Sequence, residues 1–195
     1  HLESVRILGE TRIGSSPFLI LCDHASNHVP PEFASLGLPA AEFERHIAWD
    51  PGAALLAEAL AVRLAAPAIL SCFSRLLIDP NRGTDDPTLV MRLSDGTVIP
   101  GNRHVSDADI AARIARFHDP YHRTIEDAIE RALAIGIAPA LISIHTFTPV
   151  WRGAPRPWHA GILWDRDDRL ARLFLTGLRA DPDLVVGDNE PYHGR

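Results

Sequence analysis

Short apolar runs alternate with amphipathic, helix-like segments along most of the chain. The runs are as short as buried strands usually are, and the segments between them carry apolar residues three or four positions apart, the spacing of one helix face. Such alternation of strand and helix is typical of an α/β fold built on a mostly parallel sheet. The expected strands cover residues 5–8, 18–22, 68–72, 76–78, 141–144, 160–164 and 184–186.

Three helices are expected between these strands. Asp50 is the expected N-cap of the first helix, because its carboxylate can accept from the free N–H groups of the first turn, and Pro51 takes the favoured first position. Pro120 lies inside the second helix and is expected to kink or restart it. The expected helices cover residues 52–64, 109–134 and 166–178.

Two stretches carry neither pattern. Residues 83–106 are rich in Gly, Pro and Asp, and a loop of this length is expected to be a functional lid or a disordered segment. Residues 148–159 hold two tryptophans and two arginines. They are interpreted either as a wall of a binding pocket or as a plain surface loop.

Length and patterning together predict a three-layer α/β/α sandwich with a mixed, mostly parallel sheet. A chain of 195 residues, 46% of them hydrophobic, can bury a sizeable core, and we expect a single domain over residues 1–195. No apolar run reaches transmembrane length, and the charged N-terminus is not followed by a signal-peptide core. The sequence therefore predicts a cytoplasmic protein without a membrane partner.

Charge and cysteine usage narrow the function classes. The formal net charge is −6, which argues against a nucleic-acid partner, since such a protein needs a basic face. Every basic residue is Arg, a pattern that coding bias explains, so only an Arg inside a motif is given a role. Cys22 and Cys72 lie far apart in apolar stretches and are interpreted as buried, reduced thiols.

Three polar segments follow expected strands directly. Residues 22–27, 79–82 and 145–148 come after the runs that end at residues 21, 78 and 144. Because the carboxyl ends of parallel strands lie along one edge of a sheet, we expect these segments to converge on one cleft.

The histidines of these segments are candidate metal ligands. A catalytic zinc typically has three protein ligands and an open water position, and His24 and His145 with Asp23 or Asp50 would provide them. The alternative is a pair of hydrogen-bonded structural histidines.

The second segment is a candidate carboxylate-binding site. Arg82, Asn81 and the preceding Arg75 could hold a substrate carboxylate, because a guanidinium presents paired donors to both oxygens. The alternative is a turn held by Asp79 and Asn81, with Arg82 paired to a local acid.

Two further groups have a weaker pattern. His118 and His122 are four residues apart, as metal ligands on a helix can be, but Pro120 lies between them and partly buried helix histidines are the favoured interpretation. Glu190 follows an apolar run and could reach the same sheet edge, or it belongs to an acidic turn ended by Pro191.

Seven segments in a fixed order span nearly the whole chain: 23–27 (DHASN), 46–53 (HIAWDPGA), 74–82 (SRLLIDPNR), 120–122 (PYH), 143–147 (SIHTF), 158–165 (WHAGILWD) and 188–192 (DNEPY). In this order they resemble the N-formylglutamate amidohydrolase family. That family is more distantly similar to the zinc carboxypeptidases and to the aspartoacylase and succinylglutamate desuccinylase group.

The resemblance implies a phosphorylase/hydrolase-like fold and assigns site residues. His24 and His145 match metal-binding histidines, and Asn81 with Arg82 matches the groups that hold a substrate carboxylate. The resemblance adds Arg75 and His122 as companions on the substrate side. The wider group has a Glu where this chain has Asn27, and since an amide oxygen is a poor zinc ligand, the third ligand would be Asp50, Asp23 or none.

The C-terminal end departs from the family pattern. Relatives continue to a further strand that carries a Glu resembling the general base, whereas this sequence ends at Arg195. We therefore expect a missing C-terminal segment, or Glu190 as the catalytic base, or a protein that is not a fast hydrolase.

The expected function is zinc-dependent hydrolysis of the amide bond of a small N-acyl amino acid, with N-formylglutamate favoured. A carboxypeptidase-like or desuccinylase-like hydrolase of another acyl group is one alternative. A non-catalytic domain that binds a carboxylate ligand is another. The sequence leaves the oligomeric state open.

Overall fold

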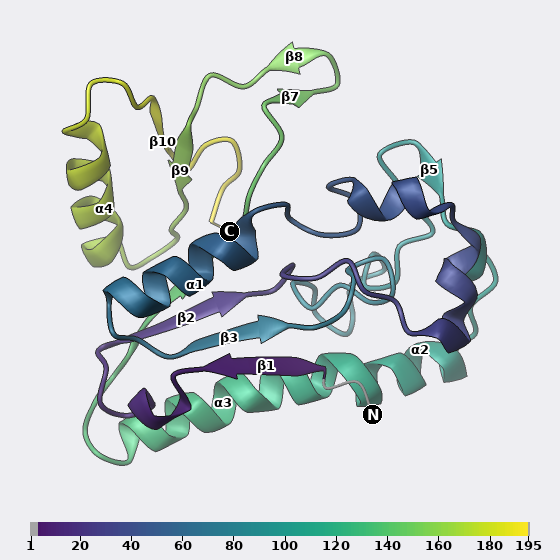
Figure 1. The fold of residues 1–195 in the computed structure, drawn as a ribbon, viewed down its shortest axis with the longest axis horizontal. Helices are drawn as coiled ribbons and strands as arrows, with labels where there is room; N and C mark the ends of the chain where they lie inside the picture. Colours follow the sequence, from purple (N-terminus) through teal and green to yellow (C-terminus); the bar gives the residue numbers. More distant parts are fainter. Residues whose placement is uncertain (1–3, 195) are drawn as a thin grey trace. The chain divides into compact units, whose positions relative to one another are not determined.

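The computed structural model describes residues 4–194. They form two compact units, one ending at Thr146 and one beginning at Phe147, which are considered separately below. Figure 1 shows the elements of both units. The expectation of a single domain stays a prediction.

The first unit is built on a four-stranded sheet in the order β1-β3-β2-β6. Strand β2 runs parallel to both of its neighbours, and β1 pairs antiparallel with β3 at the edge. The predicted mixed, mostly parallel sheet is thus confirmed. Its strands are β1 (Val5–Leu8), β2 (Phe18–Cys22), β3 (Ala68–Ser71) and β6 (Ala140–Ser143).

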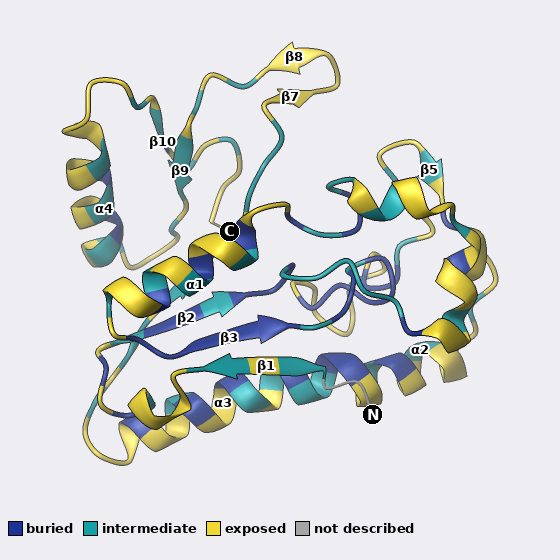
Figure 2. Cartoon of the chain, in the orientation of Figure 1, coloured by how far each residue is buried: buried dark blue, intermediate teal, exposed yellow. Residues whose placement is uncertain are grey.

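Helices cover both faces of this sheet. Helix α1 (Ala53–Arg63) buries an alanine on every fourth residue against one face, where Ile20 and Leu70 point. Helix α3 (Asp119–Leu133) packs on the other face, where Leu19 and Ile69 point. Alternate residues of a strand face opposite ways, so β2 and β3 supply both layers of the core. Figure 2 shows the sheet-facing sides of both helices buried and their outer sides exposed, which confirms the three-layer architecture.

The second expected helix is irregular where proline predicted it. Helix α2 (Asp107–Arg113) begins with a reciprocal capping box between Ser106 and Asp109. A π-helical turn, η5 (Ile114–His118), joins it to α3. The irregular turn ends two residues before Pro120, whose ring has no N–H to donate to the preceding turn.

Residues 76–78 are not the strand that their apolar character predicted. Leu76 and Leu77 form a turn, with the Leu77 N–H donating to the Ser74 carbonyl at 3.0 Å. All three side chains are fully buried, beside Phe73 and other core residues. Their apolar character reflects burial and not strand pairing.

The expected cap of α1 is also wrong. The helix begins at Ala53, and its N-cap is Gly52, which has a left-handed backbone with φ of 86°. The Asp50 carboxylate lies near two histidines instead, as described below. The chain therefore makes one more turn between Asp50 and the helix than the sequence suggested.

Residues 83–106 are neither an open lid nor disordered. They contain a short hairpin of β4 (Leu93–Ser94) and β5 (Thr97–Val98). Leu89, Val90 and Ile99 are buried in the same core cluster as residues 76–78. The remaining short helices of this unit are η1 (Glu10–Arg12), η2 (Pro31–Gly37), η3 (Ala40–Glu44) and η4 (Pro100–Asn102).

Between residues 147 and 194, the second unit contains two strand pairs and one helix. Strands β9 (Ala160–Ile162) and β10 (Val186–Asp188) are parallel, and β7 (Val150–Trp151) pairs antiparallel with β8 (Ala154–Pro155). Helix α4 (Arg169–Arg179) buries Ala171 and Leu175.

Two glycines lie opposite each other on this parallel pair. Gly161 and Gly187 are partners in the register of β9 and β10. The backbone carbonyl of Glu190 lies against both, so close that a Cβ atom at either position would overlap it. The turn after β10 therefore packs on a surface that only glycine can provide.

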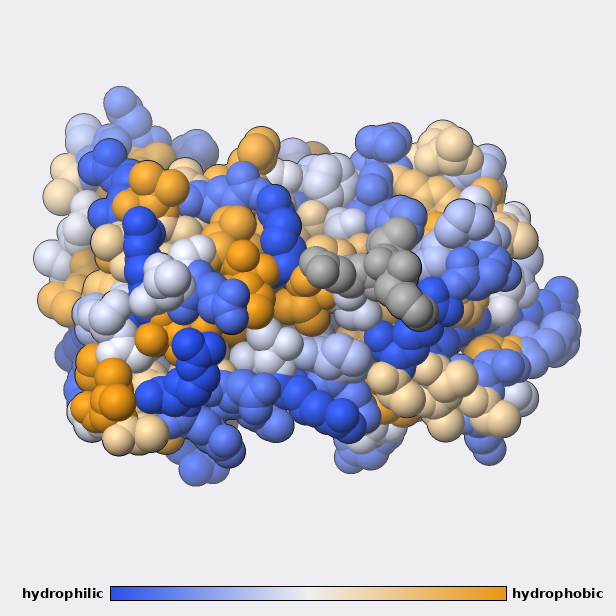
Figure 3. All heavy atoms as spheres, turned by 60° about the horizontal axis from the view of Figure 1, so that its bottom comes forward, coloured by the Kyte–Doolittle hydropathy of each residue, from blue (hydrophilic) through white to orange (hydrophobic). Residues whose placement is uncertain are grey.

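Apolar side chains reach the surface in several places. On the face that Figure 3 draws, apolar patches lie among hydrophilic side chains. Exposed apolar residues include Leu133, at the end of α3, and Ile135. Among residues 4–194, the helices are all too short or too polar to cross a membrane.

Candidate active site

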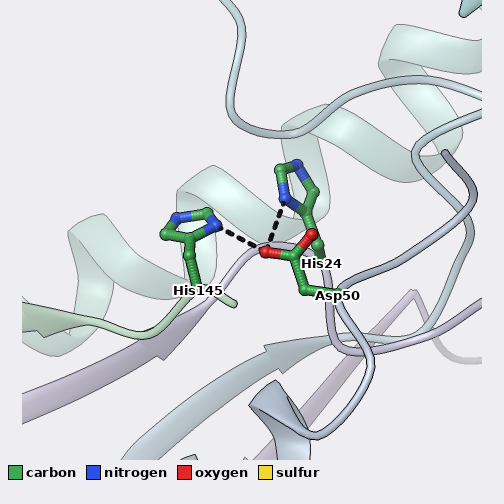
Figure 4. Close-up of side chains that lie close together, drawn as sticks. All are labelled: His24, Asp50 and His145. Carbon is green, nitrogen blue, oxygen red and sulfur yellow. Dashed lines mark hydrogen bonds and ion pairs between the residues drawn. The ribbon is translucent and has the colours of Figure 1, made fainter. Parts of the chain in front are cut away.

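Three side chains meet beyond the carboxyl ends of two parallel strands in the first unit. His24 lies two residues after β2, His145 two residues after β6, and Asp50 just before α1. Figure 4 shows both imidazoles directed at the Asp50 carboxylate. The expected convergence of the two histidines at this sheet edge is confirmed, whereas their role as ligands stays a prediction.

Backbone contacts explain why Asp50 reaches this place. Its N–H donates to the His24 carbonyl at 3.0 Å, which ties the two loops together. Its Oδ2 accepts from the Thr146 N–H at 3.2 Å, one residue beyond His145. Three segments distant in sequence are thus fixed against one carboxylate.

The distances within this group suit a small cation. Asp50 Oδ2 lies 3.0 Å from His145 Nδ1 and 3.5 Å from His24 Nδ1. One donor atom from each of the three residues can be chosen so that all lie within 4.8 Å of one another. Tetrahedral zinc ligands at ordinary bond lengths are about 3.3 Å apart, so this donor set fits such an ion.

Each histidine is held from behind by a second buried carboxylate. His24 Nε2 lies 2.7 Å from Asp79 Oδ1, and His145 Nε2 lies 3.1 Å from Asp23 Oδ2. Because a carboxylate only accepts, each Nε2 donates its hydrogen to the outer carboxylate, and each Nδ1, which faces Asp50, would bind a metal through its lone pair once it carries no proton. Metal-binding histidines in proteins are commonly oriented in this way.

Asp23 and Asp79, the outer carboxylates that bond the Nε2 atoms, also accept hydrogen bonds from other groups. Asp23 accepts from the Tyr121 hydroxyl at 2.7 Å and from the Ser143 hydroxyl at 3.2 Å. Asp79 accepts from the Asn81 N–H at 2.9 Å and from Arg75 Nη2 at 2.8 Å. These bonds fix the carboxylates, which in turn fix the imidazole rings.

The site favours charged carboxylates. Burial alone would raise the pKa of Asp50, but hydrogen bonds from His145 and His24 hold it below its ordinary value. Burial likewise opposes ionisation of Asp79, yet the bond from His24 lowers its pKa to about 2. For His145, burial alone would lower the pKa, whereas bonds to Asp23 and Asp50 raise it to about 9. A cation bound through His145 Nδ1 would displace the proton of that imidazole, because a metal binds only the neutral ring.

Access differs between the two histidines. The His145 side chain is 32% exposed, whereas that of His24 is 2% exposed. A ligand or water therefore reaches the group from the side of His145.

Arg75 borders the same group. Besides its bond to Asp79, its Nη1 lies 3.2 Å from His24 Nδ1 and 3.7 Å from Asp50 Oδ1. The guanidinium thus offsets the charge of two buried carboxylates. The sequence suggested a residue that binds substrate; the structure places it next to the metal ligands expected from the sequence, and substrate binding by Arg75 stays a prediction.

The loop of Asn81 and Arg82 is exposed, as a substrate-binding loop must be. Arg82 has one acidic neighbour, Asp86, at 3.7 Å. The Asp79 carboxylate accepts from the Asn81 N–H, so the backbone forms the turn that the alternative interpretation expected. The role of the exposed Asn81 and Arg82 side chains stays open.

The remaining sequence candidates lie in different surroundings. His122 is on α3, and its Nε2 donates to the Pro80 carbonyl at 2.9 Å. Asn27 donates its amide to the Phe43 carbonyl at 2.9 Å, so it ties down its own loop. Glu190 is exposed in the second unit, and its role as a base stays a prediction.

Sequence reasoning missed the outer roles of Asp79, Asp23 and Tyr121. The sequence pattern indicates a turn-forming role for Asp79 and a ligand role for Asp23, and neither pattern points to a partner histidine. Tyr121 occupies an apolar position of the helix pattern, which hides its hydroxyl. The motif of residues 120–122 was the available signal.

Comparison with known proteins places the chain among amidohydrolases, enzymes that cleave amide bonds. The family model described as N-formylglutamate amidohydrolase matches residues 16–195. The chain belongs to this family, as its seven segments indicated.

Crystal structures similar to this chain include the two that follow. A gene product of Agrobacterium tumefaciens is 34% identical, with 98% of this chain and 75% of that chain covered and a TM-score of 0.92. The N-formylglutamate amidohydrolase from Ralstonia eutropha is 21% identical, with coverage of 92% and 73% and a TM-score of 0.66. At that identity the second likeness supports the fold alone. Among curated proteins, no sequence matches significantly.

Proposed function

We propose that the protein is a metal-dependent hydrolase of N-formylglutamate, with zinc as the metal. The observation that carries this proposal is the group of His24, Asp50 and His145, in which both imidazoles are backed by a buried carboxylate. Family membership supports the amide substrate. Two nitrogen donors and one carboxylate are a ligand set common among catalytic zinc sites.

His24, Asp50 and His145 would hold the metal. A divalent ion bound there supplies polarisation of the amide carbonyl and activation of a water molecule. Arg75, next to this group, would stabilise negative charge that develops on the carbonyl oxygen. Asp79 and Asp23 keep the imidazole lone pairs directed inward throughout.

Substrate recognition would fall to the exposed loop. N-formylglutamate carries two carboxylates, and Arg82 can present two parallel N–H groups to one of them. Its side chain is 48% exposed and its neighbour Asp86 is 3.7 Å away, so a carboxylate ligand can replace that weak pair. Asn81 would add an amide donor, and His122 supports the loop from the helix.

Glu190 is the proposed general base, which would accept a proton from the attacking water and pass it to the leaving amine. It lies in one of the seven family-like segments, and its carboxylate is exposed.

The test combines metal content with turnover. Purified protein would be analysed for bound metal and assayed on N-formyl-, N-acetyl- and N-succinyl-glutamate, with and without a chelator. We expect zinc at about one ion per chain and hydrolysis of the formyl compound that the chelator abolishes and zinc restores. The His24→Ala variant should lose both bound zinc and hydrolysis, whereas the control His104→Ala, at an exposed residue, should keep both.

Two outcomes would contradict the proposal. Preference for another acyl group would favour a desuccinylase-like enzyme. Binding of glutamate without any turnover would favour a carboxylate-binding domain.

A further inference from the structure

Three ring-bearing side chains line one face at the start of α3. His118, Tyr121 and His122 have the spacing i, i+3 and i+4, which brings them to the same side of a helix. The two imidazole rings are tilted by 37° with centroids 4.2 Å apart, and Tyr121 meets His122 edge-on at 5.5 Å. We refer to these three residues as the ring cluster.

Tyr121 connects the ring cluster to the proposed metal site. Its side chain is fully buried, and its hydroxyl donates to Asp23 Oδ1 at 2.7 Å. The other oxygen of Asp23 bonds His145 Nε2. A hydroxyl on α3 therefore helps to hold the carboxylate that orients one imidazole.

The two histidines connect the cluster to the substrate loop. His122 Nε2 donates to the Pro80 carbonyl at 2.9 Å, and His118 Nε2 donates to the Arg82 carbonyl at 2.9 Å. These carbonyls flank Asn81. The helix thus fixes the backbone of the loop that carries Asn81 and Arg82.

The helix is irregular directly before the ring cluster. The π-helical turn η5 ends at His118, directly before α3. Such turns are rare, and they are frequently found at functional sites. His118 is only 6% exposed although its ring is polar, so its burial calls for a bonded partner, which the Arg82 carbonyl supplies.

We propose that the ring cluster is a positioning element that serves the two halves of the site separately. Tyr121 positions the metal-binding half through Asp23 and His145. His122, with His118, positions the carboxylate-binding loop. This inference rests on the proposed function, because it assigns supporting residues to the metal and substrate groups named there.

A purely structural role would give a different result. Residues that only stabilise the helix would weaken metal binding and substrate binding together, through the folded fraction of the protein. Separate positioning predicts that each substitution changes one binding constant and leaves the other unchanged.

The experiment measures both constants in the same variants. Zinc affinity would be obtained by competition with a chromophoric chelator. The KM for N-formylglutamate and the Kd for glutamate, by calorimetry, would report the substrate side. Thr124→Val, which removes a hydroxyl from the same helix, is the control for Tyr121→Phe, and His104→Ala is the control for His122→Ala.

For Tyr121→Phe we expect about tenfold weaker zinc binding with KM within about twofold of the wild type. For His122→Ala we expect KM and the glutamate Kd to rise about fivefold or more, as for one lost hydrogen bond, with zinc affinity unchanged. His122→Gln should recover most of that loss, because its amide can donate to the same carbonyl.

Failure of the proposed function and failure of the positioning inference would give different results. A wild-type protein that neither binds zinc nor hydrolyses any N-acyl amino acid would overturn the proposed function. If the wild type is active and the variants shift both constants or neither, the positioning inference alone is overturned. Should Tyr121→Phe fail to fold, the comparison of His122→Ala with His122→Gln still decides the loop half, and equal constants in both would overturn it.

Discussion

The support of His24 by Asp79 gives a quantitative prediction. Asp79→Asn keeps the shape of a fully buried side chain but replaces one carboxylate oxygen with an amide nitrogen. The two oxygens now accept from His24 Nε2 at 2.7 Å and from Arg75 Nη2 at 2.8 Å. Asparagine has a single oxygen, so it can satisfy only one of these donors.

The size of the effect follows from what is lost. Removing the outer partner of a metal-binding histidine typically costs 10- to 100-fold in metal affinity, or about 1.4–2.7 kcal/mol. A hydrogen bond to a charged group contributes about 1.5–3 kcal/mol to stability. Because the Arg75 side chain is 21% exposed, water can satisfy part of its lost pairing, and we expect the lower half of that range.

The two effects are separated by two measurements. A chelator competition near neutral pH gives the zinc affinity, and chemical unfolding of the metal-free protein gives the stability. Asp127→Asn, on the exposed side of α3, is the matched control. If folded Asp79→Asn protein bound zinc as tightly as the wild type, Asp79 would not orient a metal ligand, and the argument from the paired carboxylates would be refuted.

Three further predictions concern single side chains. Arg82→Lys should raise KM about tenfold in steady-state assays, because an ammonium cannot reproduce two parallel N–H bonds; an unchanged KM removes Arg82 from the site. Glu190→Gln should lower kcat by about 10² to 10⁴ with unchanged metal content, and a silent substitution points to another base. Burial, with the nearby charges of Asp23 and Asp50, raises the pKa of Cys22 from 9.0 to about 12. The Cys22 thiol should therefore resist alkylation below pH 9. The stability that its neutral form contributes should be lost as the pH rises from 9 towards 12. Mass spectrometry of alkylated protein checks this, and rapid labelling of folded Cys22 would contradict it.

The sequence predicted the sheet and its edge better than it predicted the contacts behind them. Strands β2 and β6 were found to within a residue because polar residues bound their apolar runs. Residues 76–78 were misassigned because a short apolar run indicates burial without indicating a partner strand. The same limit applies to α1, whose N-cap depended on where Asp50 is held.

The candidate site, like the fold, is only partly predictable from the sequence. His24 and His145 could be expected to meet because both follow parallel strands. The bond between His24 and Asp79 joins residues 55 positions apart, and that between Tyr121 and Asp23 joins residues 98 apart. No local pattern encodes such distances. Tyrosine at an apolar position looks like a core residue until the atom facing its hydroxyl is known.

The paired glycines under the Glu190 turn have a consequence for mutational scanning. Alanine at Gly161 or Gly187 would place a methyl group where the Glu190 carbonyl lies, so the turn would have to move. Both positions should therefore be intolerant of every substitution, although neither glycine has a side chain that could take part in catalysis. A scan scored by activity would rank them beside the catalytic residues, and only a readout of the folded turn would separate architecture from chemistry.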